Sequence, residues 1–150
     1  MIPTSATVAD TSAEFAWPVR VYYEDTDAQG VVYYANYFKF MERARTEWIR
    51  GLGIEQDALA NELRRIFVVV DTSAEFRQPA RFNDELIVTV RLLEKARASF
   101  LLGQDIYRQQ HDGELLCRAT VRAACLNADS KKPARLPEPL NQLNLKDVSR

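Results

Sequence analysis

The spacing of the hydrophobic residues changes twice along the chain, and this pattern constrains the fold more than any other feature. Between Tyr37 and Leu52 apolar side chains recur at helical spacing, with charged residues on the opposite face. Gly51 and Gly53 are typical of a helix C-terminus. Residues 55–63 carry a shorter pattern of the same kind. The pattern therefore predicts one long helix followed by one short helix.

On both sides of the helical region, apolar and polar residues alternate as they do in half-buried β-strands. The alternating segments are 15–23, 66–78, 85–93, 97–108 and 114–126. Pro79 and the sequence 111–113 mark turns between later strands. The apolar stripe of the helix can be buried only against one face of the sheet. This predicts an α+β fold, in which a curved five-stranded antiparallel sheet wraps around one long central helix. Uncovered sheet edges predict self-association.

The chain has 150 residues, the usual size of a single domain. We expect a mobile leader at 1–14, one domain at 15–139 and a polar tail at 140–150. The net charge of −1, with both signs interspersed, argues against nucleic-acid binding, and no apolar run is long enough to predict membrane insertion. The N-terminus has neither the basic nor the apolar region of a secretory signal. A cytoplasmic location is the resulting expectation.

Two cysteines, Cys117 and Cys125, lie eight residues apart on one predicted strand. An extended strand separates such residues by about 26 Å, too far for a disulfide within the chain. Without a histidine nearby they are also poor metal ligands, so no metal site is expected.

Residues 22–37 read YYEDTDAQGVVYYANY and carry the strongest chemical signal. Two carboxylates, Asp25 and Asp27, precede Gly30 and the start of the predicted helix. A carboxylate in a turn can act as a base or a nucleophile, and free N–H groups at a helix N-terminus can stabilise an oxyanion. The same residue types are also ordinary turn formers, so the pattern alone leaves both interpretations open.

Several other chemistries are excluded by missing residues. The single histidine, His111, lies in a predicted turn, which leaves no histidine for a Ser-His-Asp triad or an H-E-x-x-H zinc site. The chain also lacks a G-x-S-x-G nucleophile elbow and the glycine patterns of nucleotide-binding loops.

The run D-T-D-A-x-G-V-V-Y-x-A-N-Y, followed by F-x-x-E-R-A-R-T-E, resembles the signature of hotdog-fold acyl-CoA thioesterases. The likeness is greatest to the 4-hydroxybenzoyl-CoA thioesterase type, in its Tol–Pal-associated bacterial branch. It covers about residues 18–137 and includes a weaker patch, F-R-Q-P-A-R-F-N-D-E-L, at 76–86. The resemblance implies a hotdog fold and an acyl-CoA substrate, with no cofactor. It also implies a homodimer or homotetramer, with acyl carrier protein as an alternative carrier of the acyl group.

The resemblance also implies roles for individual residues of the motif. Asp27 matches the catalytic carboxylate of the family, and the backbone N–H of Tyr34 matches the oxyanion donor. The Tol–Pal-associated branch usually has histidine where this chain has Tyr34, a departure that concerns acyl preference more than hydrolysis. Gly30 is expected to allow positive φ or close approach of the substrate. Asp25 is expected to brace the turn, and Asn36 to cap the helix or brace the loop.

Substrate contacts are expected from the helix and from a later strand. Tyr37 and Met41 are candidates for the acyl pocket. Arg97 and Ser99 fall in the strand where relatives hold nucleotide-contacting residues, and cations are what the phosphates of coenzyme A require. Lys131 and Lys132, which follow the last strand, are further candidates, although any of these cations also fits a solvated surface position.

Three rival hypotheses remain at the sequence level. Another hotdog branch uses a helix glutamate, which draws attention to Glu42 and Glu47, although an ion pair of Glu42 with Arg45 is the simpler interpretation. A non-catalytic hotdog protein would bind acyl groups, acyl carrier protein or an envelope-biogenesis partner. A hydroxyacyl dehydratase shares the fold but normally needs a histidine, and His111 is poorly placed.

Overall fold

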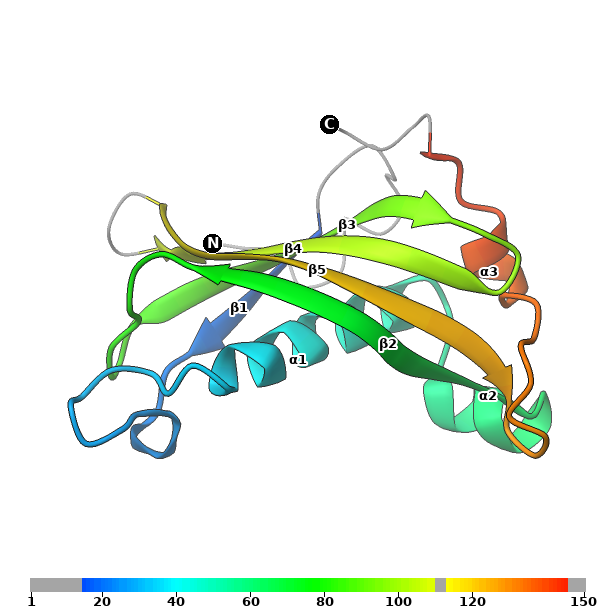
Figure 1. Ribbon diagram of the computed structural model, residues 1–150, viewed down its shortest axis with the longest axis horizontal. Helices are drawn as coiled ribbons and strands as arrows, with labels where there is room; N and C mark the ends of the chain where they lie inside the picture. The colour runs from blue at the N-terminus through cyan, green and yellow to red at the C-terminus, as the bar shows by residue number, and fades with distance from the viewer. Residues whose placement is uncertain (1–14, 110–112, 146–150) are drawn as a thin grey trace.

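The computed structural model describes residues 15–109 and 113–145, in which one long helix lies beneath a curved sheet (Figure 1). In chain order the elements are β1 (Phe15–Arg20), the short 3-10 turn η2 (Tyr23–Asp25), α1 (Asn36–Gly51), α2 (Gln56–Glu62), β2 (Arg65–Phe76), β3 (Glu85–Lys95), β4 (Ser99–Arg108), β5 (Glu114–Asn127) and α3 (Glu138–Asn141). The predicted α+β arrangement of a five-stranded sheet around a central helix is confirmed.

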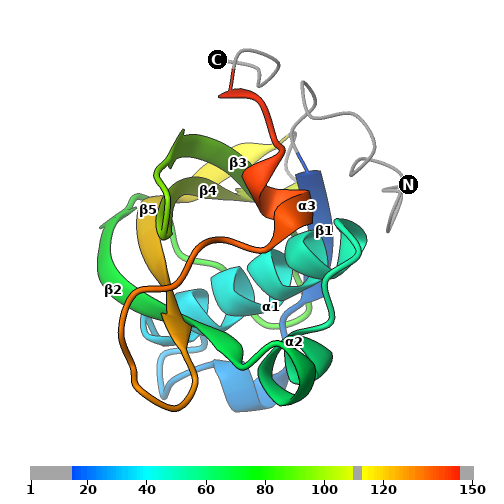
Figure 2. The ribbon, with the colours of Figure 1, turned by 90° about the vertical axis from the view of Figure 1, so that its right-hand side faces the viewer.

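The strands are ordered β1-β3-β4-β5-β2, and every neighbouring pair is antiparallel. Strands β1 and β2 form the two edges of the sheet, and α1 and α2 connect one edge to the other. The pairings β2–β5, β3–β4 and β4–β5 each contain one register irregularity. Such irregularities increase local bending and twist, so the sheet can curve over α1 as the end-on view shows (Figure 2).

Helix α1 is held by the apolar stripe that the sequence predicts. Its buried side chains are Tyr37, Phe40, Met41, Ala44, Trp48 and Ile49. They meet the inward faces of β3 and β4, where the predicted residues are buried: Leu86, Val88, Val90, Leu92, Phe100, Leu102 and Ile106. None of the described helices is long and apolar enough to cross a lipid bilayer.

One inward face departs from simple alternation. Leu115 was expected inside, but it is only half-buried, whereas Leu116 is completely buried. The β4–β5 register explains this difference: Ile106 pairs with Cys117 and Tyr107 with Leu115, so Leu116 is an extra residue at a bulge.

The ordered chain continues past the boundary expected at 139. Leu136 and Leu140 are buried, and Lys95 Nζ donates hydrogen bonds to the carbonyl oxygens of Asn141 and Leu143. Part of the expected polar tail therefore packs on the β3 end of the sheet. The expected leader at 1–14 and the turn residues 111–112 lie outside the described residues.

Replacement of Leu140 by alanine tests whether this C-terminal segment belongs to the folded domain. Leu140 is 0% exposed, so Leu140→Ala should lower the free energy of unfolding by about 2–5 kcal/mol. The exposed neighbour Gln142 is the control, and Gln142→Ala should change stability by less than about 0.5 kcal/mol. Urea denaturation measures both values. Equal stability of the two variants would show that the segment is not needed for the fold.

Candidate active site

The loop that joins β1 to α1 is braced by Asp25, which is buried although it is charged. The Tyr22 N–H donates to its Oδ2 at 2.9 Å. Its carbonyl oxygen accepts from the Tyr33 N–H at 3.0 Å and from the Asn36 side-chain amide at 2.8 Å. Asn36 is the first residue of α1, so this carbonyl ties both ends of the loop to the helix start. Asp25 and Asn36 thus brace the loop, as the sequence predicts.

Asp27 lies in a tight turn of the same loop and is exposed. Its Oδ1 accepts from the backbone N–H of Gln29 at 2.8 Å and of Val31 at 3.4 Å. Its backbone carbonyl accepts from Gly30, whose φ of +82° is the positive value expected there. The second oxygen, Oδ2, makes no hydrogen bond with the described residues. The carboxylate is therefore oriented by one oxygen and open at the other.

The start of α1 offers hydrogen-bond donors near this loop. Helix positions 36–38 donate to the carbonyls of residues 33–35. Among the described residues no acceptor faces the N–H of Tyr34 or of Ala35, and Ala35 provides no side-chain cap. Unpaired N–H groups at a helix N-terminus favour negative charge. An oxyanion could be stabilised here by backbone alone.

A second brace connects the loop and the helix to the segment between β2 and β3. The Ala80 N–H donates to the Tyr37 hydroxyl at 2.9 Å, and the Ala80 carbonyl accepts from Val32 at 2.8 Å. Burial raises the pKa of Tyr37 above its ordinary value, so the hydroxyl stays protonated. Tyr37 therefore joins the start of α1 to the segment between β2 and β3, and it also lines a cavity beside that segment.

A cavity of about 260 Å³ opens beside the free N–H groups. Its lining residues are Val32, Tyr34, Tyr37, Phe76, Arg77, Gln78 and Pro79. Phe76, at the end of β2, contacts the rings of Tyr34 and Tyr37. Phe76 and Arg77 are not among the site residues that the sequence motifs predict. The patch at 76–86 was the signal that could have indicated them.

Of the predicted site residues, Tyr34 and Tyr37 line this cavity, whereas Asp27, Gly30 and the other candidates do not. Met41 is completely buried on the face of α1 that packs against the sheet. Arg97 and Ser99 lie at the β3–β4 turn, which is at the far end of the sheet from the Asp27 loop (Figure 1). An eleven-residue strand such as β3 spans about 36 Å, so these residues cannot meet Asp27 without a second subunit. Lys131 and Lys132 follow β5 at the same far end.

The two helix glutamates and the two cysteines are not arranged for catalysis. Glu42 accepts a hydrogen bond from Thr46 rather than forming the expected ion pair with Arg45, and Glu47 pairs with Arg50. Burial raises the pKa of the Cys117 thiol to about 11, which keeps it neutral at pH 7. Both cysteines are free, as expected. The described residues contain no cluster of three or more side chains suited to a metal.

The model of the thioesterase-like superfamily matches residues 21–143. The chain belongs to this superfamily. It is 41% identical to the acyl-CoA thioesterase YbgC of Haemophilus influenzae, over 83% of this chain and 89% of that protein. It is 42% identical to the acyl-CoA thioester hydrolase YbgC of Escherichia coli, over 84% and 92% of the two chains.

Two solved structures of other proteins have the same fold as this chain. A 1,4-dihydroxy-2-naphthoyl-CoA thioesterase from Synechocystis superimposes with a TM-score of 0.80 at 25% identity, covering 86% of this chain and 93% of that one. A probable thioesterase from Bartonella henselae gives a TM-score of 0.77 at 34% identity, covering 83% and 100%. The predicted hotdog thioesterase fold is confirmed.

Proposed function

We propose that this thioesterase-like chain hydrolyses acyl-CoA thioesters at the N-terminus of α1, with Asp27 as the catalytic carboxylate. Support comes from one arrangement: a single loop places a carboxylate open at Oδ2 just before a helix start whose Tyr34 N–H has no acceptor among the described residues. The names of the YbgC relatives supply the substrate class.

The reaction needs only these two groups. As a general base, Asp27 takes a proton from water while the water oxygen attacks the thioester carbonyl. As a nucleophile, its oxygen attacks the carbonyl directly, and water then cleaves the resulting anhydride. In either route the Tyr34 N–H stabilises the oxyanion. The C–S bond breaks when this oxyanion collapses, which in the nucleophilic route happens before water cleaves the anhydride, and coenzyme A leaves as a thiolate that takes up a proton.

The open edge of β2 supports a homodimer. Val69 and Val70 are about half exposed on this twelve-residue edge strand, an aggregation hazard unless another strand covers it. A two-fold pairing of β2 with its copy is antiparallel, so the Arg65 end of one strand lies beside the Phe76 end of the other. The end of the partner's sheet that carries Arg97 and Ser99 then approaches the Asp27 loop. There Arg97 of the partner subunit would be available to bind the phosphates of coenzyme A.

The first prediction concerns the carboxylate. Asp27→Asn keeps the acceptor oxygen that orients the turn but removes the base or nucleophile, so kcat should fall about 100- to 10,000-fold. Asp57→Asn makes the same change at an exposed position on α2 and should leave turnover unchanged. Steady-state hydrolysis of acyl-CoA substrates measures both. A folded Asp27→Asn variant with near-normal turnover would refute the assignment and leave a different acid or a binding role.

The second prediction concerns the oxyanion donor. Tyr34→Pro deletes an N–H that has no acceptor among the described residues, so the fold should survive while kcat falls about 100- to 1,000-fold. Tyr34→His is the matched control, because it changes the side chain but keeps the amide. Circular dichroism verifies folding before kcat is compared. If both variants hydrolyse equally well, another N–H of the loop is the donor.

The third prediction concerns assembly. Light scattering should give at least twice the 17.2 kDa chain mass for the unmodified protein. Val70→Lys places a charge on the exposed β2 edge and should shift the mass toward the monomer with loss of turnover. Asn61→Lys, on exposed α2, is the control for added charge. A fully active monomer would rule out a site shared between subunits.

A further inference from the structure

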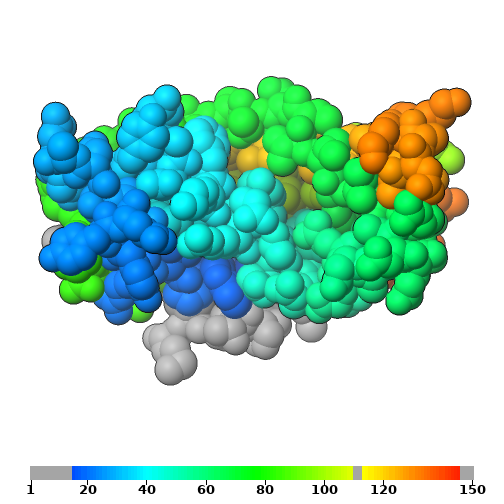
Figure 3. Space-filling view, turned by 90° about the horizontal axis from the view of Figure 1, so that it is seen from below, coloured from blue at the N-terminus to red at the C-terminus, as the bar shows by residue number. Residues whose placement is uncertain are grey.

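A second cavity lies in the seam between α1 and β2, farther along the helix than the candidate active site. Its volume is about 140 Å³. The view from below shows the hollow between these two elements, with β4 and β5 at its floor (Figure 3). We name it the seam cavity, and its lining residues are Glu42, Arg45, Thr46, Ile49, Gln56, Phe67, Val68, Val69, Phe100 and Ala123.

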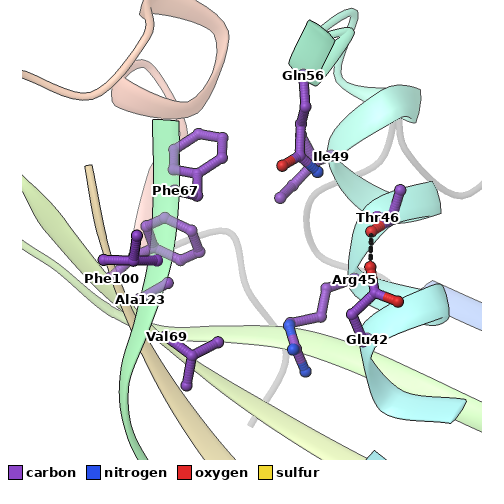
Figure 4. Close-up of a pocket in the computed structure, with 10 residues that line it drawn as sticks. Glu42, Arg45, Thr46, Ile49, Gln56, Phe67, Val69, Phe100 and Ala123 are labelled. Carbon is purple, nitrogen blue, oxygen red and sulfur yellow. Dashed lines mark hydrogen bonds between the residues drawn. The ribbon is translucent and has the colours of Figure 1, made fainter. Parts of the chain in front are cut away.

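The two walls of the seam cavity differ in polarity. The strand side carries apolar groups, with Phe67, Val69 and Phe100 facing the helix (Figure 4). The helix side carries the polar groups Glu42 and Arg45. An apolar cavity with a few convergent polar groups is typical of a small-molecule site, in which the apolar wall binds and the polar groups select.

Arg45 supplies a positive charge and hydrogen-bond donors to this cavity. It is half-buried, and burial lowers the pKa of its guanidinium, which nevertheless stays charged at neutral pH. Its Nη1 donates to Gln104 Oε1 at 3.1 Å, and Gln104 in turn donates to the Met41 carbonyl at 3.0 Å. This contact fixes the guanidinium but uses one of its five N–H donors. Donors remain for an oxygen atom of a ligand.

Glu42 determines which oxygen-bearing group suits the seam cavity. It lies one helical turn before Arg45 on the same wall, where its Oε2 accepts a hydrogen bond from Thr46. The charge of Glu42 acts on Arg45 and partly opposes the lowering of its pKa by burial, so a ligand carboxylate between them would be attracted by Arg45 and repelled by Glu42. A hydroxyl can accept from the guanidinium and donate to the carboxylate, which satisfies both.

We propose that the seam cavity holds the far end of the acyl group and selects acyl chains that carry a terminal hydroxyl there. This inference rests on the proposed thioesterase function. Both cavities are lined by residues of α1 and β2, and the nine residue steps from Asn36 to Arg45 span about 14 Å of helix. The body of a medium-length chain would lie along the seam, with its hydroxyl between Arg45 and Glu42.

The unmodified protein provides the first test. Its kcat/KM is measured for ω-hydroxydodecanoyl-CoA, dodecanoyl-CoA and dodecanedioyl-CoA. A hydrogen bond to a charged group typically corresponds to a preference of about 10- to 100-fold, so the hydroxyacyl substrate should exceed the other two by that factor. Equal rates, or a preference for dodecanoyl-CoA or for the diacid, would overturn the inference.

Two variants test the residues that would select the hydroxyl. Arg45→Met keeps a long side chain without charge and should remove most of the preference for the hydroxyacyl substrate over dodecanoyl-CoA. Arg43→Met makes the same change on the exposed face of α1 and should retain it. Glu42→Gln leaves the Arg45 charge uncompensated, so the diacid should improve relative to the hydroxyacyl substrate. If Arg45 or Glu42 had only a structural role, its replacement would lower turnover of all three substrates alike and would leave their ratios unchanged.

The remaining outcomes separate this inference from the function on which it rests. If dodecanoyl-CoA is hydrolysed with Asp27 required, but no variant changes the substrate ratios, the thioesterase function stands and the seam selection fails. If Arg45→Met converts the oligomer to a monomer by light scattering, Arg45 faces a second copy of the chain, and the selection also fails. If no acyl-CoA is hydrolysed, the proposed function itself is wrong.

Discussion

Burial of one face of α1 under the concave side of the sheet is the interaction on which the rest of the structure depends. Phe40, Met41 and Ala44 are completely buried there, and each large apolar side chain typically contributes about 1.5–3 kcal/mol. Surface ion pairs such as Arg50–Glu47 typically contribute at most about 1 kcal/mol. Apolar packing therefore determines the position of α1. The position of the helix in turn places its N-terminus at one end of the sheet.

The proposed chemistry uses what this packing leaves exposed. A helix start needs acceptors for its first N–H groups, and Ala35 supplies no side-chain cap. The carbonyl of Asp25 and the peptide of Ala80 hold the neighbouring loop against that start, so Asp27 lies in a loop braced by hydrogen bonds although its own side chain is exposed. Because the proposed oxyanion donor is a backbone amide, a tyrosine at position 34 in place of histidine leaves that part of the proposed site intact.

The same helix also explains the two cavities. Its buried face packs on β3 and β4, while its flank faces β2, the edge strand at the far side of β5. The aromatic end of β2, at Phe76, meets the helix start, and its beginning, at Phe67, faces the polar flank of the helix. Thioester cleavage and acyl selection are thus proposed for two places along one seam, and an antiparallel partner strand would cover that seam.

The sequence by itself determined the elements, the buried faces of α1, β3 and β4, and the bracing of the loop by Asp25 and Asn36. These features depend on periodicity and turn chemistry between residues near in the chain. Only the tertiary structure placed Phe76 beside Tyr34 and separated Arg97 from Asp27. It also buried Leu140 in a helix too short to show a period. Such contacts join residues far apart in the chain, and no local pattern records which strand end will meet which helix end.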